Sequence, residues 1–123
     1  METGRHIALG ADGEDLACAE LERRGYVILE RRYRTRAGEI DIVARHGDVL
    51  VFVEVKTRQS GRCGSPAEAV TRTKRRRLAL MAGDYLARRR PRAAGCRFDV
   101  VAVTIDDGRA GIRVIPGAFM VGE

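Results

Sequence analysis

Residues 51–57 read V-F-V-E-V-K-T, an apolar run that is interrupted by Glu54 and Lys56. Side chains alternate between the two faces of a β-strand, so these two charges share one face and three valines share the other. A charge in a strand with apolar residues on both faces costs free energy unless it is paired or bound to a ligand. The run therefore predicts a central strand that carries a polar site on one face.

The segments on both sides of this run predict an α/β fold with a mixed sheet flanked by helices, in the order α-β-β-β-α-β-β. A tight H-G-D turn at residues 46–48 should join the second and third strands as an antiparallel hairpin. The expected elements are a helix over residues 13–25, strands over 26–34, 39–45 and 49–57, a helix over about 66–90, and strands over 97–105 and 112–115.

The helix ends carry recognisable signals. Asp12 is the expected N-cap of the first helix, and Gly25 its C-terminal stop. Ser65 as N-cap, followed by Pro66 and then by Glu68, predicts the start of the second helix. Pro91 should end that helix, whose expected inward-facing residues are Val70, Leu78, Met81, Tyr85 and Leu86.

The length of 123 residues fits a single domain over 1–123, with a core over about residues 10–120. Apolar residues make up 45% and charged residues 33% of the chain, as in globular proteins. No apolar run reaches the about 20 residues that span a bilayer, and the start has no pattern of a secretory signal. We therefore expect a cytoplasmic protein that does not enter a membrane.

The three cysteines lie far apart and form no C-x-x-C pair, which argues against a disulfide framework or a zinc site. Cys18 and Cys96 are expected to be small core residues, and Cys63 a free thiol in a loop.

The net charge of +6 favours a polyanionic partner, and nucleic acid is the commonest one in a cytoplasm. An acidic membrane surface is the weaker alternative, because no stretch opposes its basic residues with a broad apolar face. A basic stripe on the second helix suits a phosphate backbone, although such stripes are often only solvated. The candidate nucleic-acid-binding residues are Arg58, Arg72, Lys74, Arg75 and Arg76, with Arg77 beside them.

The hairpin should bring Asp41 beside Glu54 and Lys56, with Glu39 at the rim. Two carboxylates on rigid strands suit a hard divalent cation such as Mg²⁺. An adjacent lysine can orient or deprotonate a water molecule, so the group has the parts of a phosphodiester hydrolase. An ion pair on a solvated face is the competing interpretation. For Asp99, a structural pair with Arg97 and a functional role are both open.

The pattern D-x12-E-x-K from Asp41 to Lys56 resembles the signature of PD-(D/E)XK nucleases, whose fold is restriction-endonuclease-like. The motifs that carry a closer resemblance are G-E-D-L-A, R-x-R-x-G-E-I-D-I-V-A, F-V-E-V-K-T-R and R-F-D-V-V-A-V. Through these motifs the chain more closely resembles the YraN-like family of small bacterial proteins. These are predicted nucleases related to Holliday-junction resolvases. One departure is that many relatives have Asn where this chain has Arg32.

The resemblance implies that Asp41, Glu54, Lys56 and Glu14 are catalytic. Asp41, Glu54 and the carbonyl of Val55 would hold one or two Mg²⁺ or Mn²⁺ ions, with Glu14 approaching them from the first helix. We accordingly predict a metal-dependent endonuclease acting on DNA, with branched or structured DNA as a candidate substrate. Resolvases of this kind cut two strands as dimers, which makes a homodimer a further expectation.

Two other functions fit the same sequence. A non-catalytic nucleic-acid-binding module with this fold would bind DNA in a salt-sensitive way without needing a metal. A protein-interaction domain with a positive surface would dock an acidic partner and bind DNA weakly even at low salt.

Overall fold

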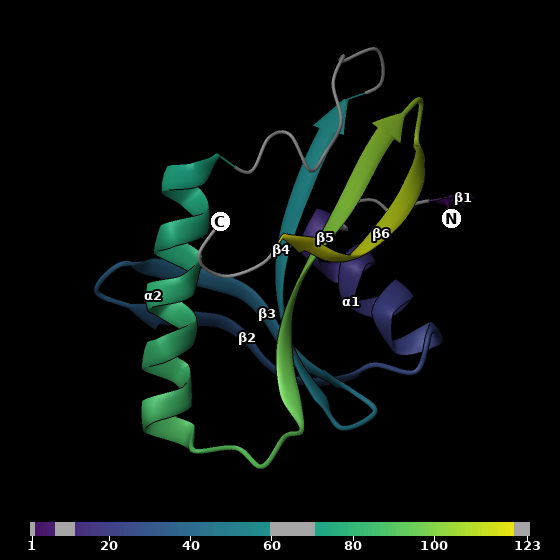
Figure 1. Ribbon diagram of the computed structural model, residues 1–123. Helices are drawn as coiled ribbons and strands as arrows, with labels where there is room; N and C mark the ends of the chain where they lie inside the picture. Colours follow the sequence, from purple (N-terminus) through teal and green to yellow (C-terminus); the bar gives the residue numbers. More distant parts are fainter. Residues whose placement is uncertain (1, 7–11, 60–70, 120–123) are drawn as a thin grey trace.

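Six strands form one sheet in the spatial order β1-β6-β5-β4-β3-β2, with a helix against each face (Figure 1). The computed structural model describes residues 2–6, 12–59 and 71–119. Its elements are β1 (Glu2–His6), α1 (Gly13–Arg23), β2 (Val27–Thr35), β3 (Gly38–His46), β4 (Val49–Gln59), α2 (Arg72–Arg89), β5 (Gly95–Asp106) and β6 (Arg109–Phe119).

The mixed sheet and the order α-β-β-β-α-β-β are confirmed. β4 and β5 run parallel at the centre, and every other neighbouring pair is antiparallel. Parallel strands need a crossover connection, and α2 lies in the one between β4 and β5. The sequence did not predict β1, whose residues E-T-G-R-H show no alternation of apolar side chains and pair with β6 at the sheet edge.

The last strand is longer than the predicted segment 112–115. β6 runs on through Pro116 and Gly117, and its register against β5 shifts between Phe98 and Val100. A bulge of this kind tolerates a proline, which cannot donate a ladder hydrogen bond. The strand therefore continues past a residue that sequence patterns treat as a strand end.

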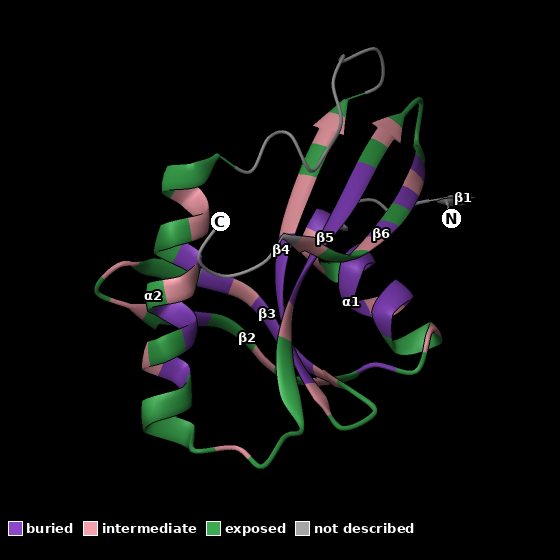
Figure 2. Ribbon diagram, viewed as in Figure 1, coloured by how far each residue is buried: buried purple, intermediate pink, exposed green. Residues whose placement is uncertain are grey.

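The alternation along β4 divides its side chains between two cores, as predicted. Val51 and Val53 pack with Leu16 and Leu21 of α1 on one face of the sheet. Leu50 and Phe52 pack on the other face against α2, through Leu78, Met81, Ala82 and Tyr85. Figure 2 shows the middle parts of β4 and β5 buried and both ends of α2 exposed. The charged end of β4 consequently extends from a strand that is buried on both sides.

Both ends of α1 follow the predicted signals. The Asp12 side chain caps the helix by accepting a hydrogen bond from the backbone N–H of Asp15 at 2.8 Å. At the other end Gly25 has a φ of 92°, and its N–H donates to the carbonyl of Glu22 while Tyr26 donates to Leu21. This double hydrogen bond is a Schellman motif, which needs a left-handed residue at the position of Gly25.

The second helix begins later than predicted. Thr71 has an extended backbone and caps α2 by accepting from the N–H of Lys74, so an unbroken helix from Pro66 is wrong. Ser65, Pro66, Glu68 and Val70 lie outside the described residues. Leu86, predicted to face inward, is exposed because the buried stripe runs through Leu78, Met81, Ala82 and Tyr85. Neither helix in the described ranges is long and apolar enough to cross a lipid bilayer.

Two of the predicted cysteine environments can be compared. Cys18 is buried in the α1-side core, as predicted. Cys96 is exposed and not a core residue, because burial along β5 begins only at Phe98. Cys63 lies outside the described residues.

Asp99 is a structural residue at the β5–β6 bulge. Its carboxylate is fully buried and accepts hydrogen bonds from the Tyr26 hydroxyl at 2.7 Å, the Arg97 guanidinium at 2.8 Å and the Gly117 N–H at 2.9 Å. A buried charge of this kind is tolerated because its acceptor positions are filled. The pairing of Asp99 with Arg97, one of the two predicted alternatives, is thus present.

We predict that Asp99→Ala lowers the free energy of unfolding by about 3 to 5 kcal/mol, because it leaves the Arg97 charge and a buried hydroxyl without their acceptor. Asp106→Ala, at the exposed end of the same strand, should change it by less than about 0.5 kcal/mol. Urea denaturation followed by circular dichroism measures both. A loss below about 1 kcal/mol for Asp99→Ala would contradict this role of the carboxylate.

Candidate active site

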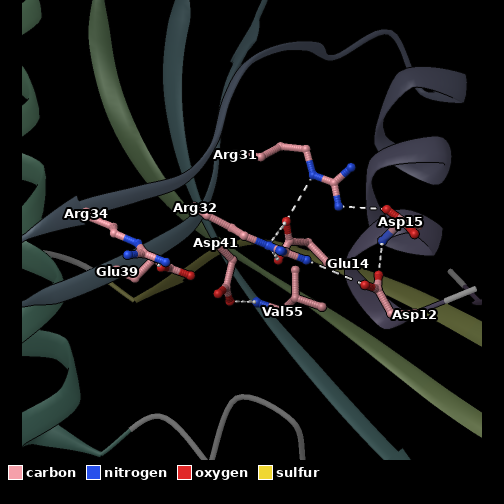
Figure 3. Close-up of polar contacts among 9 residues, drawn as sticks. All are labelled: Asp12, Glu14, Asp15, Arg31, Arg32, Arg34, Glu39, Asp41 and Val55. Carbon is pink, nitrogen blue, oxygen red and sulfur yellow. Dashed lines mark hydrogen bonds and ion pairs between the residues drawn. The ribbon is translucent and has the colours of Figure 1, made fainter.

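Asp41 lies where β3 and β4 separate. The last register pair of the β3–β4 ladder at this end is Ile42 with Val53. One residue farther along, Oδ2 of Asp41 accepts a hydrogen bond from the backbone N–H of Val55 at 2.7 Å (Figure 3). A buried N–H without an acceptor is costly, so the carboxylate replaces the backbone carbonyl that the ladder no longer supplies.

The backbone of β3 rotates at the same point. Ile40 packs in the α2-side core and Ile42 in the α1-side core, although residues two apart in a regular strand share a face. Arg32 of β2 lies opposite Asp41, because the register pairs on either side are Tyr33 with Ile40 and Arg31 with Ile42. The backbone of Arg32 has a φ of 54°. This local twist directs the Asp41 carboxylate toward β4.

Glu54 extends from β4 on the side of α2. Its residue is only 9% exposed, and its Oε1 lies 2.5 Å from Nζ of Lys74, in the first turn of α2. Glu54 acts electrostatically on Asp41, so the predicted juxtaposition of these two carboxylates is present. Lys56 lies two residues farther along the same face of β4. Lys74, predicted to bind nucleic acid, is placed against a buried carboxylate.

The carboxylates of the site influence one another. Burial raises the pKa of Asp41 to about 6, although the hydrogen bond from Val55 opposes this shift. The negative charges of Glu54 and Glu14 raise the pKa of Asp41 further. A cation placed beside Asp41 would favour its ionised form and oppose this shift.

The two lysines differ in their preference for the proton. Contact with Lys74, followed by burial, lowers the pKa of Lys56. For Lys74 burial acts in the same direction, but the contacts with Glu54 and Lys56 outweigh it, and the pKa of Lys74 is raised. Lys74 accordingly keeps its charge beside Glu54, while Lys56 gives up a proton more readily than an ordinary lysine.

Glu14 reaches the site from α1. A Cβ on Gly13 would collide with the side chain of Thr57, so glycine permits the close approach of this helix end to β4. The Glu14 side chain is 15% exposed and is held by Arg31 at 2.9 Å and by Arg32 at 3.2 Å. Figure 3 shows its carboxylate beside Asp41, with the Arg32 side chain running between β2 and α1.

The donor set at this point suits Mg²⁺ or Mn²⁺. The N–H and C=O of one strand residue point to the same edge, so the Val55 carbonyl faces β3 together with the N–H that Asp41 binds. Two carboxylates and a carbonyl are hard oxygen donors, and Mg²⁺ is commonly held by one or two carboxylates and water. Across the described ranges no three His, Cys, Asp or Glu side chains are gathered into a metal-binding cluster. The fit therefore rests on Asp41, Glu54 and Val55.

The remaining basic candidates lie around the start of α2. Arg72, Arg76 and Arg77 are exposed, whereas Arg75 and Arg58 are partly buried. The first turn of α2 contains basic residues and no acidic residue. Positive charges are disfavoured at a helix N-terminus, where the helix dipole is also positive, so this arrangement suits an anion.

The cationic partners of Glu14 were not predicted from the sequence. Arg31 and Arg32 bind Glu14, and Arg31 also binds Asp15 at 2.7 Å. Glu39, predicted at the rim, is exposed and pairs with Arg34 at 3.2 Å. The run E-R-R-Y-R predicts positive charge beside the site. The left-handed backbone at Arg32, on which these contacts depend, has no recognisable sequence pattern.

The raised pKa of Asp41 predicts a pH-dependent stability. Because the folded protein binds this proton more tightly than the unfolded chain, the stabilisation is complete below about pH 4 and is lost as the pH rises through about 6. Asn at this position retains an acceptor for Val55 but does not titrate. Between pH 4 and 7.5 the wild type should therefore lose roughly 2 to 3 kcal/mol relative to Asp41→Asn, as measured by urea denaturation. Parallel pH profiles would contradict the partly buried position of this carboxylate.

Comparison with known proteins identifies relatives along most of the chain. A family profile described as "Uncharacterised protein family UPF0102" matches residues 13–103. A UPF0102 protein of Geobacter metallireducens is 51% identical over 112 residues, which are 91% of this chain and 92% of the relative. Another, from Symbiobacterium thermophilum, is 52% identical over 112 residues, or 90% and 95% of the two chains. A third, from Syntrophotalea carbinolica, is 47% identical over 119 residues, 97% of each chain.

The matched range runs from the start of α1 to the middle of β5 and includes every acid of the site. The resemblance to the YraN-like proteins is confirmed at the level of the family: this chain belongs to UPF0102.

Proposed function

We propose that this protein is a metal-dependent endonuclease of the PD-(D/E)XK superfamily that hydrolyses phosphodiester bonds of DNA. The observation that carries the proposal is the position of Asp41 at the split between β3 and β4, directly beside the segment that bears Glu54 and Lys56. The proposal is supported by the electrostatic influence of Glu54 on Asp41 and by the position of Lys56 two residues beyond Glu54 on the same strand of the mixed sheet.

The carboxylates of Asp41 and Glu54 are the proposed metal ligands. Burial makes Asp41 costly to keep ionised, Glu54 is a buried carboxylate on the neighbouring strand, and the Val55 carbonyl adds a third oxygen donor on the same side. When bound there, Mg²⁺ would supply Lewis acidity to the scissile phosphate. The two carboxylates would hold and orient it, with Glu14 contributing negative charge from α1.

Lys56 is the candidate for handling the nucleophile. Its lowered pKa leaves more of the amine in the neutral form, which accepts a proton or a hydrogen bond from water. Its position on rigid β4, next to the acids, would hold that water within reach of the phosphate. Lys74, which keeps its charge, would remain a cation beside the same site.

A nucleic acid would approach over the first turn of α2. Exposed Arg72, Arg76 and Arg77 and the positive end of the helix dipole offer binding to successive phosphates. Aromatic residues make up only 5% of the chain, so contacts with the backbone fit better than stacking with bases. Such contacts do not read base sequence, so the proposed substrate is DNA recognised through its backbone, with branched DNA as the form suggested by the resemblance to resolvases.

A second candidate function is a non-catalytic nucleic-acid-binding module. The observation in its favour is the ion pair between Glu54 and Lys74, which already gives the buried carboxylate a cationic partner. Such a module would bind DNA equally well with and without a divalent cation and would not cleave it.

We predict that the wild type nicks branched or linear DNA in the presence of Mg²⁺ or Mn²⁺, and that EDTA abolishes the activity. Asp41→Asn and Lys56→Ala should each lower the cleavage rate by roughly 100-fold or more, because each removes a group that acts at the reacting phosphate. Gel assays with labelled substrates measure the rates.

Asp48→Asn is the matched control, since it removes an exposed carboxylate at the other end of the same hairpin. Its cleavage rate should equal that of the wild type. Cleavage that EDTA or Asp41→Asn leaves unchanged would refute the nuclease proposal. DNA binding without cleavage, in wild type and variants alike, would establish the non-catalytic module.

A further inference from the structure

The backbone of Arg32 has a conformation that does not favour arginine. Its φ of 54° lies in the left-handed region, which Gly and Asn adopt at a lower cost than residues with longer side chains. Local propensity therefore does not account for an arginine at this position. Strained backbone conformations are common at functional sites, so the contacts of the Arg32 side chain are a candidate reason for the arginine.

The side chain of Arg32 is engaged with acids of α1. Its Nε lies 3.2 Å from both carboxylate oxygens of Glu14, and its terminal nitrogen lies 3.5 Å from Oδ2 of Asp12. Arg31 extends to the same helix and binds Glu14 and Asp15. In Figure 3 the Arg32 side chain extends from β2 toward α1, where its guanidinium meets Glu14 and Asp12.

This contact places a positive charge on Glu14, whose carboxylate is near enough to Asp41 to raise its pKa. Arg32 stands opposite Asp41 across the β2–β3 ladder, and Glu14 is the α1 acid that faces Asp41. A divalent cation held by Asp41 and Glu54 would be repelled by the guanidinium and attracted by the same Glu14 carboxylate. The divalent cation and Arg32 would thus compete for the negative charge of the Glu14 carboxylate.

We propose that Arg32 competes with the divalent cation for Glu14, so that it lowers the metal affinity of the free protein and is released when the metal binds. The inference rests on the proposed metal site at Asp41 and Glu54. Once released, the guanidinium at the site entrance is available to a phosphate oxygen, for which its planar donors are well suited. Metal binding and phosphate binding would in this way be coupled through one side chain.

The test is isothermal titration of Mn²⁺ into wild type, Arg32→Asn and Arg34→Asn at low salt and pH 7.5. Asn suits the left-handed backbone, and circular dichroism confirms folding. Removal of the competing cation should tighten Mn²⁺ binding about fivefold, a modest change because Arg31 still holds Glu14. Arg34→Asn removes the same charge from the same strand, but its side chain is 86% exposed and pairs with Glu39, so the affinity should change by less than about twofold.

A second comparison isolates Glu14. In a Glu14→Gln background Arg32→Asn should no longer tighten binding, because the contested carboxylate is gone. Equal affinities of Arg32→Asn and wild type, or a gain that persists in the Glu14→Gln background, would overturn the role of Arg32 alone. Absence of Mn²⁺ binding in wild type and Arg32→Asn together would overturn the metal site and with it the proposed function.

Discussion

The hydrogen bond from the Val55 N–H to the Asp41 carboxylate is the contact on which the site depends. It terminates the β3–β4 ladder with a side chain, and it therefore lets two central strands diverge without leaving a buried donor unpaired. The gap is where groups from both faces of the sheet can meet. Glu54 comes from the side of α2 and Glu14 from the side of α1, and both raise the pKa of Asp41. A regular ladder would have kept these acids on separate surfaces.

Each acid around Asp41 has a cation supplied by the chain itself. Lys74 of α2 neutralises Glu54, and two arginines of β2 neutralise Glu14. A buried carboxylate is stable only with such a partner. The contacts that stabilise the fold would therefore also lower the affinity of the proposed metal site for a divalent cation, which would have to displace these cationic side chains.

The sequence predicted the sheet and the position of the acids because both depend on short-range rules. Alternation along residues 51–57 assigns faces, and a tight turn fixes which residues of β3 and β4 become neighbours. The partners of the acids could not be predicted in the same way. The resemblance to PD-(D/E)XK nucleases favours Lys74 as a helix-borne residue near the site, but its contact with Glu54 depends on where α2 docks. The contact between Arg32 and Glu14 depends on a local left-handed backbone. The late start of α2 at Arg72 reflects capping by Thr71, a weaker sequence signal than the Ser-Pro pair before it.

We propose that the split between β3 and β4 binds a divalent cation. Crystals of the protein soaked in Mn²⁺ test it directly, because anomalous scattering locates the metal without reference to activity. We expect one peak about 2.1 Å from oxygens of both Asp41 and Glu54, with Nζ of Lys74 displaced from Glu54. Diffraction that shows no peak at Asp41, with the Lys74–Glu54 pair intact at saturating Mn²⁺, would contradict the claim and leave these acids as structural groups.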